Sequence, residues 1–289
     1  MHNLPLLRST SQLRSRIRSW RAFGETVALA PVGPNLHEGH AAVIRAARSG
    51  ADRVLVAAAD WDGDAAAITL DSLIDRLCEQ ADEAGADALY IPSQGALRPE
   101  EATTRLDIGA MGEVMCGEDR PGLFSAYALS AVRLFSQAQA DFAYYPERDW
   151  QRLAIMRRVS ADLAQPTEVR DAPTERDMDG LAFSDEAAGL SGADRACAVR
   201  LWREIGRAAA SIEAGEAPDP ALDEAADRLA DAGAEVEYLD LRDAETLEEI
   251  ETWDAERPAR VFAAIRLGDA RLVDNVPVGG GDAAGGLVL

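Results

Sequence analysis

Two histidines stand three residues apart in the segment Leu36-His37-Glu38-Gly39-His40, and the chain has only one other histidine, His2. Imidazoles can donate hydrogen bonds to phosphate oxygens and to the charge that develops during phosphoryl or nucleotidyl transfer. The same spacing also suits a metal pair, or two residues that cap and pack the start of a helix. The metal alternative is the weaker one, because the three cysteines (Cys78, Cys116 and Cys197) lie far apart and show no ligand spacing. The spacing alone leaves phosphate binding and capping open, and we expect no metal ligands from the protein.

The residues on either side of the pair predict a strand, a turn and a helix. Residues 26–32 are apolar and predict a strand, residues 33–35 are Gly, Pro and Asn, and residues 40–48 predict a helix. A helix that starts after such a turn is an anion site, because free backbone N–H groups and the helix dipole face the ligand. This context favours phosphate chemistry for His37 and His40.

The composition limits the possible partners. With 289 residues, 47% of them hydrophobic, the chain can form one large α/β domain or two domains. A formal net charge of −22 argues against a nucleic-acid-binding surface, which needs excess positive charge. All 29 basic residues are arginine, so an arginine where chemistry prefers lysine can reflect this bias.

The sequence predicts neither a membrane segment nor an export signal. No apolar run is long enough to span a bilayer. The arginine-rich start lacks the hydrophobic core of a signal peptide and predicts a short basic helix. Three scattered cysteines, each an ordinary buried thiol, fit a reducing compartment, so we expect a cytoplasmic protein.

Strand-like and helix-like segments alternate through the first 170 residues. Strands are predicted at residues 53–58, 88–92, 141–145 and 167–170, and helices at residues 68–84, 123–138 and 149–164. This alternation is typical of an α/β fold with a Rossmann-like parallel sheet flanked by helices. Ligands in such sheets bind at the carboxyl ends of the strands. Since His37, His40 and residues 147–149 each follow a strand, we expect them at the same edge.

The pattern changes near residue 170. Helices are predicted at residues 191–214 and 219–232, and strands at residues 236–241, 259–267 and 270–273. We therefore expect a nucleotide-binding domain at residues 1–170, a smaller α+β domain at 171–278, and a flexible glycine-rich tail at 279–289.

Several segments, in order along the chain, resemble segments of the pantothenate synthetase (pantoate–β-alanine ligase) family, within the HxGH nucleotidylyltransferase-like superfamily. Residues 31–40 resemble the first ATP loop of that family, and residues 120–124 resemble its Arg-Pro-Gly-His-Phe segment. Residues 146–153 resemble Gly-Glu-Lys-Asp-Tyr-Gln-Gln-Leu. Residues 179–184 resemble the start of the second ATP-contacting stretch, and residues 237–243 and 271–275 resemble parts of the C-terminal domain.

The resemblance implies an ATP-dependent ligase. ATP activates the carboxylate of pantoate as an acyl-adenylate and pyrophosphate leaves; the amine of β-alanine then attacks, giving pantothenate and AMP. The implied partners are these small molecules, with Mg²⁺ bridging phosphate oxygens. The resemblance also implies a homodimer and a C-terminal domain that acts as a lid.

Site residues follow from the same resemblance. His40 falls at the active-site position, His37 supplies a second phosphate donor, and Arg148 stands where the family has a phosphate-binding lysine. The nucleotide-binding set comprises Gly33, Leu36, His37, Gly39, His40, Glu147, Arg148, Asp149 and Ser184. Asp64 and Arg152 fall at positions that contact the acid substrate.

The departures from the family cluster at ligand contacts. Residues 60–64 lack the glutamine of Asn-Pro-x-Gln-Phe, and Arg152 replaces a second glutamine. Leu123 replaces a histidine, and Glu186 replaces an arginine of Ser-Ser-Arg-Asn. A carboxylate that faces a triphosphate weakens binding unless a metal or another arginine intervenes. Arg152 could instead pair with a more acidic substrate, or lie on a solvated helix face.

Three functions stay open at this level. The first is a ligase that makes pantothenate, the second a ligase or nucleotidyl transferase for another acid, and the third a non-catalytic protein that binds a nucleotide or a partner. Pyrophosphate release with pantoate favours the first, and release only with other acids favours the second. An absence of nucleotide binding would leave the third.

Overall fold

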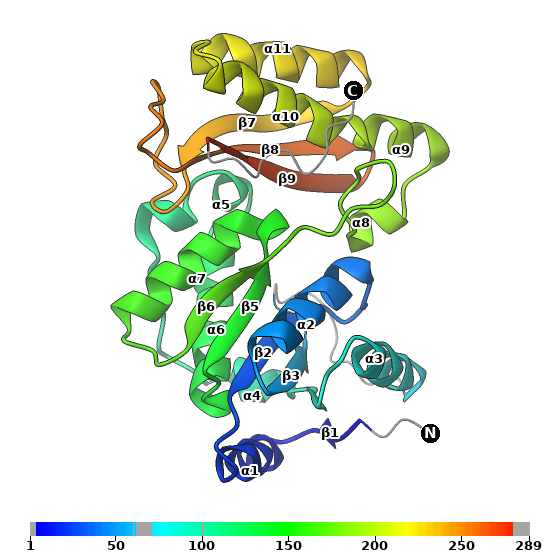
Figure 1. The fold of residues 1–289 in the computed structure, drawn as a ribbon, viewed down its shortest axis with the longest axis vertical. Coiled ribbons are helices and arrows are strands. Elements are labelled where there is room, and N and C mark those ends of the chain that lie inside the picture. Colours follow the sequence, from blue (N-terminus) through cyan, green and yellow to red (C-terminus); the bar gives the residue numbers. More distant parts are fainter. Residues whose placement is uncertain (1–3, 60, 62–70, 100, 280–289) are drawn as a thin grey trace. The chain divides into compact units, whose positions relative to one another are not determined.

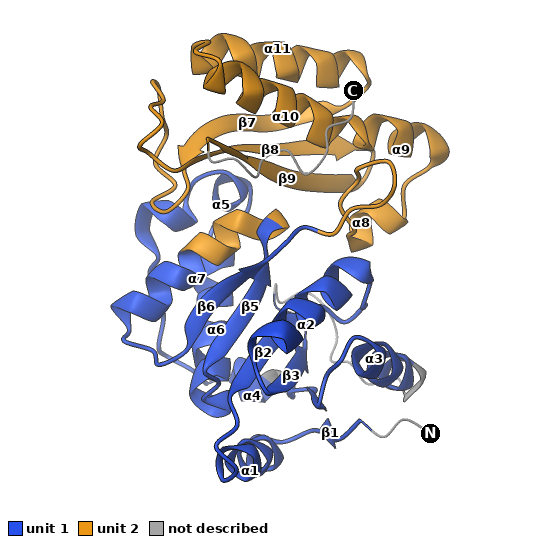
Figure 2. Cartoon of the chain, viewed as in Figure 1, with its two compact units in different colours: residues 1–147, 155–174 blue, residues 148–154, 175–289 orange. Residues whose placement is uncertain are grey.

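The computed structural model describes residues 4–59, 61, 71–99 and 101–279. The chain divides into two compact units (Figure 2). Unit 1 comprises residues 1–147 and 155–174, and unit 2 comprises residues 148–154 and 175–289. The chain therefore enters unit 2 briefly, returns to unit 1, and leaves it again after residue 174.

Unit 1 is built on a six-stranded sheet with the order β1-β4-β3-β2-β5-β6 (Figure 1). Its strands are β1 (Leu6–Leu7), β2 (Val27–Val32), β3 (Arg53–Ala58), β4 (Ala88–Tyr90), β5 (Phe142–Pro146) and β6 (Glu168–Ala172). Every neighbouring pair is parallel, so all carboxyl ends lie at one edge. The predicted parallel sheet is confirmed.

Helices surround this sheet. They are α1 (Thr10–Arg21), α2 (Glu38–Gly50), α3 (Asp71–Glu83), α4 (Gln94–Leu97), α5 (Cys116–Asp119), α6 (Leu123–Ala138) and α7 (Trp150–Asp162), with short 3₁₀ turns η1 (Gly109–Gly112) and η2 (Glu147–Asp149). Helices α2 and α3 pack on the face that carries Ala30 and Val56. Leu29 and Leu55, on the opposite face, are also fully buried. Burial on both faces explains why these strands are continuous apolar runs.

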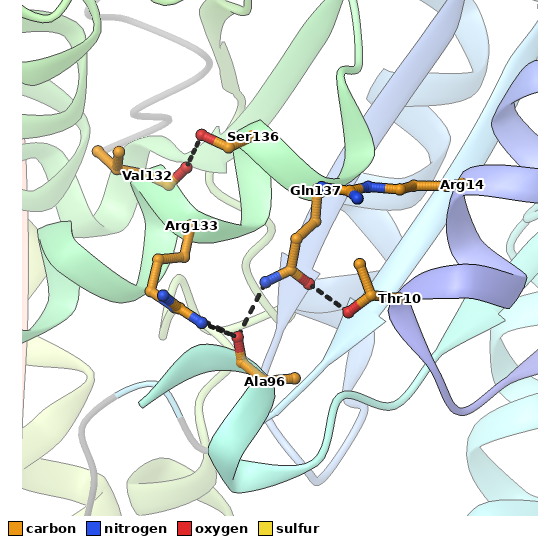
Figure 3. A pocket seen from close by; sticks show the side chains of 7 residues that line it. All are labelled: Thr10, Arg14, Ala96, Val132, Arg133, Ser136 and Gln137. Atoms are coloured by element: carbon orange, nitrogen blue, oxygen red, sulfur yellow. Dashed lines mark hydrogen bonds between the residues drawn. The ribbon is translucent and has the colours of Figure 1, made fainter. Parts of the chain in front are cut away.

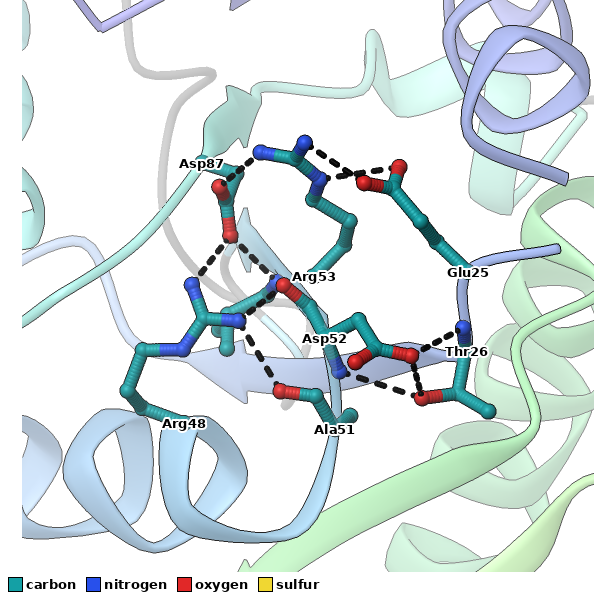
Figure 4. A network of polar contacts seen from close by, with 8 residues as sticks. Glu25, Thr26, Arg48, Ala51, Asp52, Arg53 and Asp87 are labelled. Atoms are coloured by element: carbon teal, nitrogen blue, oxygen red, sulfur yellow. Dashed lines mark hydrogen bonds and ion pairs between the residues drawn. The ribbon is translucent and has the colours of Figure 1, made fainter. Parts of the chain in front are cut away.

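A polar network fixes the amino ends of β2 and β3 (Figure 4). Arg53 donates to Glu25 at 2.7 and 3.0 Å and to Asp87 at 2.8 Å. Asp52 accepts hydrogen bonds from the backbone and side chain of Thr26, and these bonds hold the pKa of its carboxyl below the usual value. The network lies at the edge opposite the carboxyl ends, so it positions the strands without entering a ligand site.

The described residues of unit 2 include a three-stranded antiparallel sheet and the helices that follow residue 184 in sequence. The strands β7 (Glu235–Asp243), β8 (Ala259–Leu267) and β9 (Ala270–Val278) lie in that order. The helices are α8 (Asp185–Ala188), α9 (Gly192–Ala198), α10 (Arg200–Glu213) and α11 (Pro218–Asp231). Residues of α10 and α11 pack against the face of the sheet that carries Val261, Ala263 and Ile265. The predicted α+β architecture is confirmed.

Two elements differ from their predictions more than the others do. The helix predicted at residues 191–214 is interrupted at Val199, which keeps helical angles and joins α9 to α10. Strand β9 continues to Val278, five residues beyond the predicted end. Its extension contains the buried polar residues Asp274 and Asn275, and Pro277 is tolerated because β9 is an edge strand.

The described residues also settle two smaller points. No helix among them is long and apolar enough to cross a membrane. All three cysteines are described and buried, and none is in a disulfide, as predicted for ordinary thiols. Burial raises the pKa of the Cys78 and Cys197 thiols, which keeps them protonated.

Candidate functional site

His37 is the N-cap of α2. Its backbone is extended (φ −130°, ψ 175°), and its Nδ1 accepts a hydrogen bond of 3.1 Å from the backbone N–H of Gly39. A nitrogen that accepts carries no proton, so in the neutral ring the proton lies on Nε2. The capping alternative is therefore correct, and capping also fixes the tautomer that offers Nε2–H to a ligand.

His40 stacks on His37, with ring centroids 4.0 Å apart and planes inclined by 29°. The backbone N–H of Gly33, in the turn after β2, approaches His40 Nε2 at 3.4 Å. This contact is long for a hydrogen bond and is therefore weak. The turn, the helix start and both imidazoles thus form one packed group.

The start of α2 offers fewer free N–H groups than the sequence predicted. The N–H of Gly39 bonds to the His37 ring, and the N–H of His40 bonds to the His37 carbonyl at 2.9 Å. Because these groups are used within the cap, the imidazoles replace them as candidate donors to an anion. The helix dipole still favours an anion at this place.

A hollow of about 240 Å³ opens beside the cap, within unit 1. Its lining comprises Leu36, His37, Glu38, Ala41, Arg45, Gln80, Glu83 and Ala84. Gln80 Nε2 donates to the carbonyl of Leu36 at 3.3 Å, which ties α3 to the turn. The hollow is mixed in character, with apolar side chains next to charged ones, as small-molecule sites often are.

Glu147 follows β5 at the same edge as the histidine pair. Strands β2 and β5 are parallel neighbours with Leu29 paired to Ala143, and they end at Val32 and Pro146. His37, His40 and Glu147 therefore follow strands that end at one edge, as predicted. The next residue, Arg148, already belongs to unit 2.

Within unit 2, three of the expected residues form one charged group. Arg148 Nη2 lies 3.2 Å from Asp149 Oδ1, and Arg152 Nη1 lies 4.0 Å from Asp149 Oδ2. The side chains of all three are about one-fifth exposed. Arg152 is thus neither a solvated surface residue nor fully buried, and it shares a carboxylate with Arg148.

Carboxylates surround the guanidinium of Arg148. Burial by itself lowers the pKa of this group, but the charges of Asp149, Glu186 and Asp274 outweigh that effect and raise the pKa. Asp274 also accepts two hydrogen bonds from Arg176, at 2.5 and 2.8 Å. Arg148 therefore stays a cation, and its charge is already compensated by the protein.

The remaining expected residues have separate surroundings. Ser184 is buried and caps α8, because its Oγ accepts a 3.0 Å hydrogen bond from the N–H of Ala187. Asp64 lies outside the described residues. The described chain contains no group of three or more His, Cys, Asp or Glu residues arranged to hold a metal ion.

Sequence reasoning gave no role to Asn275 or Arg260, which contact the segment that carries Arg148. Asn275 Nδ2 donates to the carbonyl of Arg148, and the Arg260 guanidinium lies over the Trp150 ring. The available signal was a pair of polar residues, Asp274 and Asn275, between the apolar pair at residues 272–273 and the apolar residues 276–278. Such residues are buried only where they find partners.

A second hollow of about 430 Å³ lies elsewhere in unit 1 and is not lined by any expected site residue (Figure 3). Residues of α1, α4 and α6 line it, and their polar groups bond to one another. Arg133 and Gln137 both donate to the carbonyl of Ala96, and Gln137 Oε1 accepts from Thr10. These bonds hold three helices together, which accounts for the polar lining.

Comparison with known proteins agrees with this geometry. The sequence profile described as pantoate-beta-alanine ligase matches residues 5–277. The chain is 38% identical to the pantothenate synthetase of Dinoroseobacter shibae over 283 residues, covering 95% of this chain and 99% of that protein. It is also 38% identical to the pantothenate synthetase of Paracoccus denitrificans over 286 residues, covering 96% and 99%.

Solved structures resemble the fold over nearly its whole length. A pantothenate synthetase from Thermus thermophilus superposes with a TM-score of 0.83 at 31% identity, covering 96% of this chain and all of that one. A pantoate-beta-alanine ligase from Francisella tularensis, complexed with beta-gamma ATP and beta-alanine, superposes with a TM-score of 0.72 at 21% identity, covering 95% and 97%. The chain belongs to the pantoate–beta-alanine ligase family.

Proposed function

We propose that this chain is an ATP-dependent ligase that joins pantoate to β-alanine. A carboxylate oxygen of pantoate attacks the α-phosphorus of ATP, and the bond to the β-phosphate breaks to release pyrophosphate. The amine of β-alanine then attacks the acyl carbon of the adenylate. AMP leaves, the amine loses a proton, and the new amide is pantothenate. Membership of the family over residues 5–277 is the observation that carries this proposal.

The histidine pair supports the first half-reaction. His37 offers Nε2–H because Gly39 holds its Nδ1, and His40 lies stacked against it. We assign both rings to the phosphates, where preorganised donors stabilise the charge that develops on the leaving pyrophosphate. Gly33, Leu36 and Gly39 form the turn and helix start that hold the rings in place.

Arg148 is the proposed phosphate cation, and Glu147, Asp149 and Ser184 complete the proposed nucleotide contacts. The arginine keeps the charge of the family's lysine but presents a planar fork in place of a compact ammonium. Ser184 and its helix cap would hold the stretch that begins α8.

We propose that Mg²⁺ arrives with ATP. It would neutralise and bridge phosphate oxygens, which hard cations prefer as ligands. The homodimer, the cytoplasmic location and the lid role of the C-terminal region rest on the resemblance and stay predictions.

One feature favours a second candidate, a ligase for a different acid. Arg152 replaces a glutamine of the family, and its guanidinium could pair with a carboxylate that pantoate lacks. Asp64, the other proposed acid contact, lies outside the described residues. The two candidates share every step except the identity of the acid.

The test is pyrophosphate release by the purified protein with Mg-ATP, with and without pantoate and β-alanine. Release that requires pantoate, with pantothenate formed when β-alanine is added, supports the first candidate. If pantoate gives no pyrophosphate release but a dicarboxylic or hydroxy acid from a panel does, the second candidate is supported. If no acid gives pyrophosphate release, the ligase function is overturned.

A further inference from the structure

We propose that Asn275 is a positioning residue that sets where Arg148 lies. This inference rests on the proposed function, because it takes Arg148 as a phosphate contact. Asn275 itself acts on the backbone of the segment that carries Arg148. Nothing in the resemblance gives it this role.

The contact is a well-formed hydrogen bond from a buried side chain to a partly buried carbonyl. Asn275 Nδ2 donates to the backbone carbonyl of Arg148 at 2.9 Å, and the Asn275 residue is 4% exposed. Its Oδ1 accepts from Arg260 Nε at 2.5 Å, which orients the amide so that Nδ2 faces Arg148. The amide thus accepts from one neighbour and donates to the other.

Strand register explains how these side chains meet. Asn275 pairs directly with Phe262 in the β8–β9 ladder, and Arg260 precedes Phe262 by two residues. Side chains two apart on a strand share a face, so Arg260 and Asn275 are diagonal neighbours. Their face is the one opposite the residues that α10 and α11 cover.

The same face holds Trp150, two residues after Arg148. The Arg260 guanidinium lies 3.8 Å from the centroid of the Trp150 ring, and Trp150 Nε1 donates to the carbonyl of Ala244 at 2.7 Å. The anchor segment, residues 148–150, is therefore held at a carbonyl, a ring face and an indole N–H. Asn275 links the first two of these points through its two polar atoms.

The anchor segment needs such support. Residues 147–149 form a single 3₁₀ turn, which has few internal hydrogen bonds of its own. The charges of three carboxylates act on Arg148, so a shift of its backbone changes how its guanidinium interacts with them. A displacement of about 1 Å at a binding group can cost roughly a hundredfold in rate.

Two substitutions separate the donor from the acceptor. Asn275→Asp keeps an oxygen for Arg260 but replaces the donor to the Arg148 carbonyl with a carboxylate oxygen that repels it. Asn275→Ala removes both bonds. Val276→Ala is the matched control, because Val276 is a neighbouring buried residue of β9 that packs in the core on the other face.

The readouts are the equilibrium Kd for Mg-ATP, the KM for ATP and kcat of pyrophosphate release, and the unfolding temperature. We expect both Asn275 variants to bind ATP about tenfold more weakly, whereas Val276→Ala changes only the unfolding temperature. The KM for pantoate should move less than the KM for ATP. Asn275→Asp provides a second test if Asn275→Ala does not fold.

The outcomes distinguish the two proposals. Wild-type protein that releases pyrophosphate, with Asn275 variants that bind ATP as tightly as it does, overturns the positioning role alone. Equal weakening by Val276→Ala also overturns it, because general destabilisation would then explain the loss. Wild-type protein that binds ATP but releases no pyrophosphate overturns the proposed function and leaves the positioning role to be judged by the Kd values.

Discussion

His37 caps α2 and is our proposed phosphate donor, and replacing it by serine or by alanine tells these two roles apart. Serine is a strong N-cap, so His37→Ser keeps a side-chain acceptor for the N–H of Gly39. Its hydroxyl is too short to reach where imidazole Nε2 lies. His37→Ala loses both the cap and the donor. Both variants lose the stacking on His40, so the effect of that loss cancels when the two variants are compared.

The structure sets the size of each effect. Loss of the cap costs about 1 kcal/mol, which lowers the unfolding temperature by roughly 2–4 °C in a chain of this size. We therefore expect His37→Ala to unfold that much below His37→Ser. Loss of one preorganised donor to a developing phosphate charge costs about 10²–10³ in kcat, and both variants should show it.

Two measurements test the reasoning, thermal unfolding and steady-state pyrophosphate release with Mg-ATP and pantoate. If His37→Ser retained the wild-type kcat, His37 would be a cap and no phosphate donor. If the two variants unfolded at the same temperature, the Gly39–His37 bond would contribute nothing to stability.

Three further predictions follow from the same structure. His40→Ala should lower kcat for pyrophosphate release by at least about a hundredfold, because it removes a ring at the proposed phosphate site; full retained activity would refute the assignment. Glu186→Gln should tighten ATP binding by roughly fivefold at low salt, since it removes an exposed negative charge that acts on Arg148, and the gain should shrink as salt is raised. Asp243 carries a lowered pKa: burial raises it, but bonds from Arg257 and from the N–H groups of residues 245 and 246 outweigh that. Its stabilising effect is present above the unfolded pKa of about 3.9 and is lost as the pH falls through the lower folded value, so Asp243→Asn should lose stability at pH 7 and show a shallower decline in acid, measured by urea unfolding against pH.

The sheet of unit 1 could be predicted because its signal is local. Strands β2 and β3 are buried on both faces, so each is an unbroken apolar run that needs no knowledge of its neighbours. Helix α6 also has a local signal, and its predicted and observed bounds coincide. By contrast β1 has only two residues, Leu6 and Leu7, and exists because β4 lies beside it. A strand of that length carries no periodic signal.

The residues of the candidate site likewise divide into those with a local sequence signal and those without one. His37 and His40 could be singled out because both lie on one turn, and their types and spacing suggest the chemistry that we propose for them. Asn275 and Arg260 could not, because they are fifteen positions apart in sequence and meet only through the register of β8 and β9. The resemblance pointed at residues 271–275 without saying what they hold. Which atoms they hold required the structure.

The charges around Arg148 determine how strongly Glu186 affects the net charge of this part of unit 2. Three carboxylates (Asp149, Glu186 and Asp274) act on Arg148, while Arg152 and Arg176 pair with two of them. Three acids and three arginines leave this group close to neutral. A group in which the family's cation stood in place of Glu186 would carry two more positive charges. If unit 2 binds the triphosphate as we propose, it offers hydrogen-bond donors but little net attraction, and the proposed Mg²⁺ would have to offset most of the charge on ATP.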